Sequence, residues 1–513
     1  MSDSVLMKPA VLSKGRLWAS LAVILFGQFV VSIDLTVLNI ALPDLTQDLS
    51  PTSDQLLWIV DVYSLVLAGL IVATSAMSDR IGRKAMLLGG FFLFGAGSLA
   101  IMFANEPVHV IAIRAVLGVA GAMIMPVTIS MIRSIFLDAK ERAVAVAAWS
   151  AIAALGMAVG PLVGGLLLDI FSWHAAFFVN VPFMWLACLV GIFVLPEVRL
   201  SDPPRFDLAA SLVFLAGTTL LLWGIKHCAA ELAFDREGVI ALVIGAVLFA
   251  GFIARCLTAK NPLVDLSLFR SRTFTAGVVA TIGCTFAMAV LLYLLAQWLQ
   301  VVNGDDAFEA GLKLVPMALA SIVASAGAMW LATKFQVRNI VFGGLALAAL
   351  AMIMLVFFRE DLEVGPILVS TALVGVGTGA LALGASLIMC ETPPEKASSA
   401  GSLQEISYDL GNVLGVAILG SVASMIYRSG LPGGPLREMG LDSSLIDQCR
   451  ESFATTALIA DELGLPELFR RGVEAFDDSV VLTAFAGGVV ILVVAAIVRA
   501  LIPRDVDITA QGE

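Results

Sequence analysis

The sequence predicts an all-α membrane protein that crosses the bilayer many times. Of its 513 residues, 59% are hydrophobic and only 14% are charged, whereas a soluble domain carries about 25% charged residues. Apolar runs of about 20 residues, the length that a helix needs to cross a bilayer, recur along most of the chain. Such runs favour helices over a membrane barrel, whose strands are shorter and alternate in polarity. The chain is therefore expected to be a helical polytopic membrane protein.

About fourteen spans are predicted by the length criterion. The first six lie at 17–39, 54–76, 85–104, 108–132, 142–168 and 175–195, and two more follow at 208–226 and 238–257. The last six lie at 274–300, 309–332, 339–358, 364–389, 398–427 and 479–502. We interpret the first span as a retained helix rather than a signal peptide, because no small-residue cleavage site follows it.

The charges between the spans predict the orientation. Basic residues cluster in alternate loops, and they include Arg80, Arg83, Lys84, Arg133, Lys140, Arg142, Arg199, Arg255, Arg270, Lys334, Arg338 and Lys396. The intervening short loops are acidic or nearly neutral. Because basic loops stay on the cytoplasmic side, both termini are expected in the cytoplasm. The polar segment 428–478 then lies outside, as a lid or as a solvated loop, with short helices expected over 443–463 and 466–476.

Ionisable residues inside the apolar runs are the main functional signal. Glu405 and Asp409 lie four residues apart in one span, on one face of a helix. Asp34 lies deep in the first span, Asp61 lies in the second, and Arg114 is the one basic residue placed deep within a span. Charge in hydrocarbon is costly and indicates an ion or substrate path. A lone buried cation needs a partner, and we expect Asp34 to pair with Arg114.

Two further patterns concern the helix framework. The turn after the second span contains Asp79, Arg80, Gly82 and Arg83; glycine permits the turn, and Asp79 can pair with a neighbouring cation. Simple anchoring by positive charge is an equally good interpretation of this turn.

In the fifth span, Gly156, Gly160 and Gly164 share one face, which allows close approach of another helix. Pro161 removes a backbone donor there and bends the helix. The alternatives are ordinary packing of small residues and a flexing interface.

Together these motifs resemble the major facilitator superfamily, in particular its fourteen-span drug:proton antiporter branch. The turn resembles the Gly-x₃-Asp-Arg-x-Gly-Arg-Lys motif, with Ser75 in place of the first glycine, and the fifth span resembles the antiporter motif Gly-x₃-Gly-Pro-x₂-Gly-Gly. The stretch from Trp58 to Gly69 and the acidic pair resemble the quaternary-ammonium and methyl viologen (Smv-type) exporters. The resemblance implies two six-helix halves that rock around a central site. It places the boundaries at 1–16 (tail), 17–195 (first half), 196–270 (linker with two extra helices), 271–502 (second half) and 503–513 (tail).

The resemblance implies a proton-coupled exporter of lipophilic cations, located in the bacterial cytoplasmic membrane. Arg114 then acts in proton coupling, or alternatively only in a fixed ion pair. Asp61 acts in cation recognition or protonation, unless it merely lies near the outer surface. Protons and drug would compete for Glu405 and Asp409. Aromatic side chains able to line a cation cavity are Trp58, Tyr63, Phe286, Tyr293 and Tyr408.

Other function classes are weaker. No catalytic motif, cofactor site or metal-ligand spacing is present in the sequence, so we expect neither an enzyme nor a metal protein. A sensor would need a soluble signalling domain, and an anion carrier should show basic residues in its cavity. The remaining alternatives are transport of an endogenous metabolite and a non-transport membrane sensor. The expected partners are lipophilic cationic small molecules, protons and the bilayer, with no nucleic acid, and the chain is expected to be a monomer.

Overall fold

The computed structural model describes residues 13–504 and 506, without 52, 169, 200–206, 232–235, 260–261, 306, 360–361 and 391. Within these ranges the chain is almost wholly helical and contains no strand. Fourteen helical runs in this part are long and apolar enough to cross a membrane. The predicted all-α polytopic class and the predicted number of spans are therefore confirmed.

The first half is a bundle of six spans. Its helices are α1 (Lys14–Leu49), α2 (Ser53–Ile81), α3 (Arg83–Ala100), α4 (Pro107–Ile135), α5 (Ala139–Leu168), α6 (Ala175–Phe178) and α7 (Asn180–Val194). Helix α1 packs along α5, α2 packs along α4, and α3 packs against α4 and α7. Their shared core is apolar and includes the fully buried Ile24, Phe91 and Phe94. The small helix α6 and α7 together form the sixth span.

The second half contains the last six spans. Its helices are α10 (Arg272–Gln297), α11 (Ala307–Ala332), α12 (Val337–Ile353), α13 (Val364–Thr378), α14 (Ala380–Cys390), α15 (Ala397–Leu414), α16 (Gly420–Gly430) and α20 (Pro466–Leu501). One predicted span, 364–389, is divided at Gly379 into α13 and α14. A Cβ at Gly379 would lie 2.6 Å from Ala324 Cβ, so the glycine lets α11 pack closely at this division.

Two π-helical turns interrupt long helices of the second half. One, Trp298–Val302, continues α10, and the other, Gly415–Leu419, joins α15 to α16. The second follows the acidic pair by two turns of helix. Such π-turns are frequent at functional sites. They are also a feature that the hydrophobic pattern of the sequence does not reveal.

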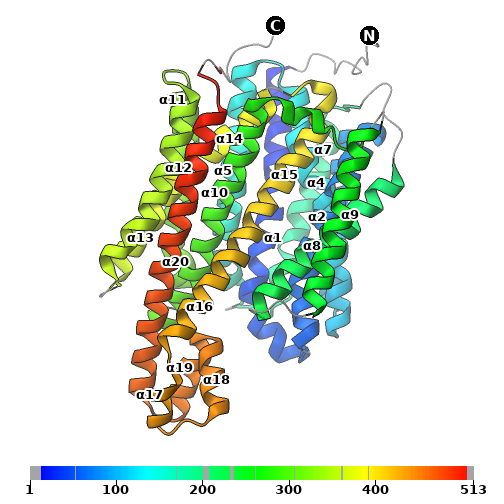
Figure 1. Ribbon diagram of the computed structural model, residues 1–513. Coiled ribbons are helices and arrows are strands. Elements are labelled where there is room, and N and C mark those ends of the chain that lie inside the picture. Colours follow the sequence, from blue (N-terminus) through cyan, green and yellow to red (C-terminus); the bar gives the residue numbers. More distant parts are fainter. Residues whose placement is uncertain are drawn as a thin grey trace.

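The two extra helices, α8 (Leu208–Glu231) and α9 (Arg236–Thr258), pack along each other on the outside of the first half (Figure 1). Asp207 accepts a hydrogen bond from Arg255 Nε at 2.6 Å, and this bond holds the pKa of the Asp207 carboxyl below its usual range. Gly69 of α2 lies directly under Leu215 of α8. A small apolar cluster also joins α8, through Leu222, to α2 and to Val413 of α15.

The two halves meet along two seams. At one seam α5 packs against α11 and α14, and at the other α15 packs against α2 and α4. We call the end of the bundle that carries Arg80, Arg142, Lys334 and Lys396 the basic end. The opposite end is called the acidic end.

Segment 428–478 is a folded helical bundle at the acidic end, rather than a solvated loop. It contains the end of α16, then α17 (Gly433–Glu438), α18 (Ser443–Glu451) and α19 (Phe453–Glu462), and the start of α20 (Figure 1). The predicted separate helix at 466–476 is instead the beginning of α20, which continues unbroken into the last span. Phe453 stacks on Phe476 with ring centroids 5.2 Å apart, and Tyr427 meets both rings edge-on. We call this segment the outer bundle.

The aromatic contacts predict how the outer bundle responds to mutation. Phe453→Ala, at a side chain only 3% exposed, should destabilise the outer bundle by about 3–5 kcal/mol because it leaves a cavity. Trypsin cleavage at Arg437 and Arg450 in the purified protein should then become faster. Leu458→Ala on the same helix is the control, because Leu458 is 65% exposed. Equal cleavage of the two variants would show that the rings do not hold this bundle together.

Candidate functional site

A buried ion pair joins α1 to α4. Arg114 Nη1 lies 3.4 Å from Asp34 Oδ2, and Arg114 Nε donates to the Ile59 carbonyl at 3.2 Å. Asn180 of α7 donates to the other carboxylate oxygen of Asp34 at 2.8 Å. Both charged side chains are at most 3% exposed, so removing one would leave the other as an uncompensated buried charge. The predicted pairing is present, whereas its role in coupling stays a prediction.

Helix α2 adds an aromatic ring and a second acid to this pair. The guanidinium carbon of Arg114 lies 4.7 Å from the centre of the Tyr63 ring, a cation–π contact. Tyr63 is fully buried, and its hydroxyl has no hydrogen-bond partner in the part of the chain that the structure describes. Asp61 lies within electrostatic range of Arg114. In this conformation the Tyr63 ring therefore contacts the guanidinium group of Arg114. A cationic ligand could form the same kind of contact with this ring.

The acidic pair lies on α15, the helix that faces the first half. Glu405 is 1% exposed, and its Oε1 atom has no hydrogen-bond partner among the described residues. Asp409, one turn further along, is partly exposed and interacts electrostatically with Glu405. Among the described residues, no basic side chain forms an ion pair with either carboxyl group. The two carboxyl groups therefore lie one helical turn apart with no described cation paired to either of them.

A small cavity lies between Glu405 and the first half. Its volume is about 10 Å³, which is close to the minimum for a single water molecule. Glu405 and Tyr408 line it from α15, and Gln28, Trp149 and Met157 line it from α1 and α5. The Tyr408 hydroxyl donates to the Met157 sulfur at 2.8 Å and so closes the cavity across the halves. A drug-sized ligand can enter only after the halves separate.

The structure thus divides the predicted site residues into groups. Asp34, Asp61, Tyr63 and Arg114 lie together in the first half, and Glu405, Tyr408 and Asp409 lie along α15. Asp409 is also within electrostatic range of Tyr63, so the two groups approach each other.

The other predicted aromatic residues lie elsewhere or are not described. Trp58 is 44% exposed on α2, about one and a half turns before the buried Tyr63 of the same helix. Phe286 is buried on α10, where its backbone carbonyl faces Gly415. The side chain of Tyr293 lies outside the described residues, as does that of Pro161.

Several residues that line this cavity were not predicted from the sequence, and they include Gln28, Trp149 and Met157. Gln28 had a signal, because an amide in the middle of the first apolar run is costly unless it faces a polar interior. Trp149 donates from Nε1 to Thr128 Oγ1 at 3.0 Å, which fixes its ring at the cavity. Met157 lies between Gly156 and Gly160 in the sequence, so the glycine motif itself includes a residue that lines the cavity.

The halves are joined by hydrogen bonds at the basic end. Ser75 donates to the Ser398 carbonyl at 2.8 Å, and the Ser398 hydroxyl donates to Asp79 Oδ1 at 2.5 Å. Arg83 donates to the same carboxylate oxygen at 3.1 Å and reaches Ser398 Oγ at 3.2 Å. On α4, Arg133 donates to the Thr392 carbonyl at 2.6 and 3.0 Å. The structure is closed at this end.

The turn residues explain how this closure is built. Asp79 and Arg83 form an i,i+4 ion pair, as predicted for Asp79. Gly82 between them has φ +111°, which only glycine adopts without strain. Glu197, from the loop after α7, accepts from the backbone N–H groups of Val198 and Lys84, and burial raises the pKa of its carboxyl. Arg80, by contrast, is exposed.

This arrangement predicts the effect of a single hydroxyl. Ser398→Ala removes the link to Asp79 and weakens the closure by about 1–2 kcal/mol, so the basic end should open more often. The measurement is the rate of maleimide modification of a cysteine introduced at Ser402, which is 1% exposed one turn below. We expect a rate increase of about 5- to 30-fold.

Ser399→Ala is the matched control for this experiment, because the hydroxyl of Ser399 accepts from the backbone N–H of Asp265, in the segment between α9 and α10, and is not part of the link to Asp79. The explanation fails if both substitutions change the modification rate equally.

The glycine face of α5 packs against α1 as predicted. A Cβ at Gly156 would lie 2.9 Å from the Phe29 carbonyl, and a Cβ at Gly160 would overlap Thr36 and lie 3.0 Å from the Ile33 carbonyl. Any larger residue at these two positions would push α1 away from α5. This contact sets the position of Asp34 on α1, and Gly164 continues the same face toward the acidic end.

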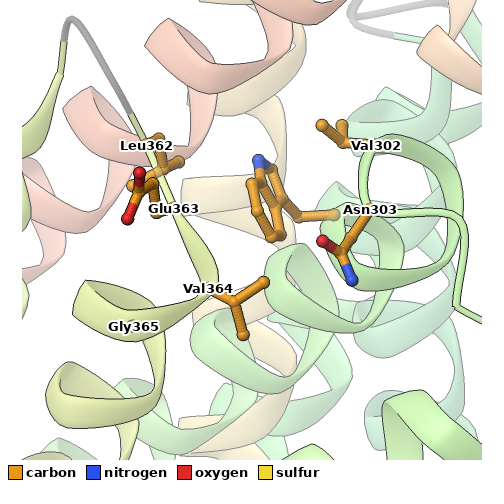
Figure 2. Close-up of a pocket in the computed structure, with 7 residues that line it drawn as sticks. Val302, Asn303, Leu362, Glu363, Val364 and Gly365 are labelled. Atoms are coloured by element: carbon orange, nitrogen blue, oxygen red, sulfur yellow. The ribbon is translucent and has the colours of Figure 1, made fainter.

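A larger pocket lies at the acidic end of the second half, apart from the predicted site. Its volume is about 450 Å³, and Trp298, Asn303, Glu363 and Val364 are among its lining residues. Figure 2 shows Leu362 and Glu363 on one side of it and Val302 and Asn303 on the other. None of the predicted site residues lines this pocket. Among the described residues, no group of three His, Cys, Asp or Glu side chains could hold a metal ion.

Comparison with known proteins agrees with this architecture. The family model of the Major Facilitator Superfamily matches residues 24–416, which include both acidic groups. The chain belongs to this superfamily. Among solved structures, the human organic anion transporter MFSD10 (TETRAN) matches with a TM-score of 0.60 at 12% identity, covering 94% of this chain and 99% of that one. That similarity confirms the transporter fold and nothing more.

Several relatives of this transporter are efflux or resistance proteins. The multidrug efflux pump LfrA of Mycolicibacterium smegmatis is 34% identical over 94% of this chain and 96% of its own length. The methyl viologen resistance protein SmvA of Salmonella typhimurium is 33% identical over 87% of this chain and 90% of its own. A tetracenomycin C resistance and export protein of Streptomyces glaucescens is 29% identical over 80% and 77%. The predicted family and the efflux-pump subgroup are confirmed.

Proposed function

We propose that this protein is a proton-coupled antiporter that exports lipophilic cations, including quaternary ammonium compounds, cationic dyes and methyl viologen. The observation that carries the proposal is Glu405, a buried carboxyl group at a small cavity between the halves, one oxygen of which has no hydrogen-bond partner among the described residues. An ionised carboxylate cannot stay in such a place without compensation. In the closed conformation a proton is the group small enough to neutralise it.

A cation can replace that proton when the cavity opens. Charge pairing with Glu405 or Asp409 and stacking on Tyr408 would stabilise a flat organic cation in the ionised site. Proton and drug then compete for the same carboxylate, so binding of one requires release of the other. This competition couples drug export to proton entry. The Asp34–Arg114 pair is a second site for a proton, because protonation of the Asp34 carboxylate would leave the charge of Arg114 unpaired. Relatives named for multidrug efflux and methyl viologen resistance support the cationic substrate class.

We also propose the topology. The basic end faces the cytoplasm of a bacterium, in keeping with the positive-inside distribution, and the outer bundle faces outward. Both termini are then cytoplasmic. The contacts between halves at the basic end support an outward-facing or occluded state for the present conformation. The transporter acts as a monomer, because each half supplies part of one central site.

Energetics sets a requirement on the coupling. Each elementary charge that crosses 100 mV exchanges about 2.3 kcal/mol. Export of a monovalent cation against an inside-negative potential therefore needs more than one proton per cycle, or a pH gradient. A divalent cation such as methyl viologen raises this requirement further. Two carboxyl groups on α15, rather than one, are consistent with such a demand.

Proteoliposomes test the proposal. Purified protein is reconstituted, the lumen is made acidic relative to the bath, and uptake of ethidium or methyl viologen is followed. Accumulation should require the pH gradient and should collapse when a protonophore is added. Liposomes without protein are the control. If neither cation accumulates in a gradient-dependent way, while a metabolite anion does, the cation antiport proposal is wrong.

A further inference from the structure

A second cavity lies on the outer surface of the second half, away from the central site. It is a groove of about 580 Å³ between α11 and α12, and its floor is the junction of α13 and α14. Both walls pack on that floor but make little contact with each other. The lining is almost wholly apolar and includes Leu331, Leu347 and Val376. The volume lies within the range of about 300–1,000 Å³ that is typical of small-molecule sites.

Glycines make this groove. Gly344 and Gly379 allow the walls to meet the floor, because a Cβ at either position would lie within 3.0 Å of a neighbouring atom. Gly327 and Gly343 differ, since a Cβ at either would meet nothing within 4 Å. These two glycines are therefore not required by helix packing. They leave open the space that a side chain would otherwise fill.

The groove opens toward the surroundings of the protein. It lies on three membrane-length spans, and its rim residues Val323 and Phe335 are 72% and 61% exposed. In a bilayer this surface meets acyl chains. An apolar hollow at that surface loses van der Waals contacts unless a chain fills it. The natural occupant of the groove is thus a hydrocarbon chain.

The charged residues at one end of the groove indicate which headgroup the hydrocarbon chain carries. The groove reaches the basic end, where Phe335 and Asn339 line it and Lys334 and Arg338 are their sequence neighbours. Lys334 Nζ lies 3.9 Å from the centre of the Trp330 ring, which places the cation at an aromatic, interfacial position. None of the described lining residues is acidic. This charge pattern suits a phosphate and opposes an organic cation.

We propose that this groove binds an anionic glycerophospholipid, with one acyl chain against Gly327 and Gly343 and the phosphate at Lys334 and Arg338. The site lies outside the central cavity and does not depend on the proposed antiport. It requires only that the basic end lies at a bilayer surface, on either side of the membrane. The lipid fills the wedge between α11 and α12 and so supports α11, which forms one of the two seams between the halves.

Native mass spectrometry of the full chain tests the proposal. The delipidated protein is mixed with phosphatidylglycerol or with phosphatidylcholine of the same chains. The wild type should retain one tightly held phosphatidylglycerol, and the double variant Gly327→Leu with Gly343→Leu should lose it. The matched control is Gly251→Leu on α9, where a Cβ also meets nothing within 4 Å. Lys334→Gln with Arg338→Gln should bind both lipids equally.

A second measurement needs no variant. Phosphatidylglycerol with a photoreactive acyl chain should cross-link the wild type mainly on peptides from 323–347. The proposal is overturned if the cross-links fall evenly on α9 and the other outward helices, or if the groove variant keeps the lipid. It is also overturned if phosphatidylcholine is retained as firmly as phosphatidylglycerol, or if ethidium displaces the lipid.

Discussion

Glu405→Gln combined with Asp409→Asn is expected to abolish gradient-driven export of ethidium while leaving the protein folded. Glutamine and asparagine keep the size of the side chains but cannot pair with a cation or release a proton. Loss of a desolvated charge pair costs about 3–5 kcal/mol, which is more than 100-fold in binding, as about 1.4 kcal/mol is tenfold. Uptake into the proteoliposomes described above should therefore fall to the level of liposomes without protein.

Folding should not suffer in this variant, because the Glu405 carboxyl has an unpartnered oxygen in the closed structure. Its elution profile and melting temperature in detergent should match those of the wild type. Asp461→Asn with Glu462→Gln makes the same change of charge at exposed positions of the outer bundle, and its transport should be normal. Unchanged export in the Glu405 and Asp409 variant would remove the pair from the mechanism.

Asp34→Ala should lower the stability of the protein more than the Glu405 and Asp409 substitutions do. It leaves Arg114 buried without its carboxylate and Asn180 without its acceptor, at a cost of about 3–5 kcal/mol. The yield of folded protein and its melting temperature in detergent should fall clearly. Replacing both charges, with Asp34→Leu and Arg114→Met, should restore much of this stability, because apolar residues of similar volume tolerate the same burial.

The double replacement separates the two roles of the pair. If the pair serves coupling, the folded double variant still fails to accumulate ethidium under a pH gradient. If the pair only holds α1 to α4, transport returns together with stability. Tyr63→Phe is a useful companion control, because it keeps the ring that Arg114 contacts and removes only a hydroxyl without a hydrogen-bond partner.

Much of the architecture could be predicted because the bilayer restricts which residues a spanning segment and its flanking loops can contain. Apolar runs of spanning length and alternating basic loops determine the spans and their direction without tertiary information. The partner of Arg114 was also predictable, since few acids share its depth. The helical nature of α18 and α19 followed from their apolar spacing. The start of α20 is marked in the sequence by Pro466, because proline is common in the first turn of a helix. The hydrophobic pattern alone does not show that this helix continues into the last span.

Contacts between distant segments were beyond the sequence. The cavity residues Trp149 and Met157 look like ordinary apolar packing until α5 is placed against α15. The bonds of Ser398 with Asp79 depend on the closed conformation of the two halves. The division at Gly379 depends on the approach of α11. Each of these features arises from how helices pack, and apolar patterning in a membrane carries little information about packing partners.

The contacts of α8 indicate which half of the transporter the two extra helices move with. Leu215 of α8 fits over Gly69 of α2, and Asp207 fastens α8 to α9 through Arg255. The contact of α8 with the second half is weaker than its contacts with α2 and α9, and it involves Val413, the π-helical turn Gly415–Leu419 and α16. When the halves separate, we expect the extra helices to remain with α2 and to slide over α15. The transporter would then move as eight spans against six, so the two moving parts would differ in size.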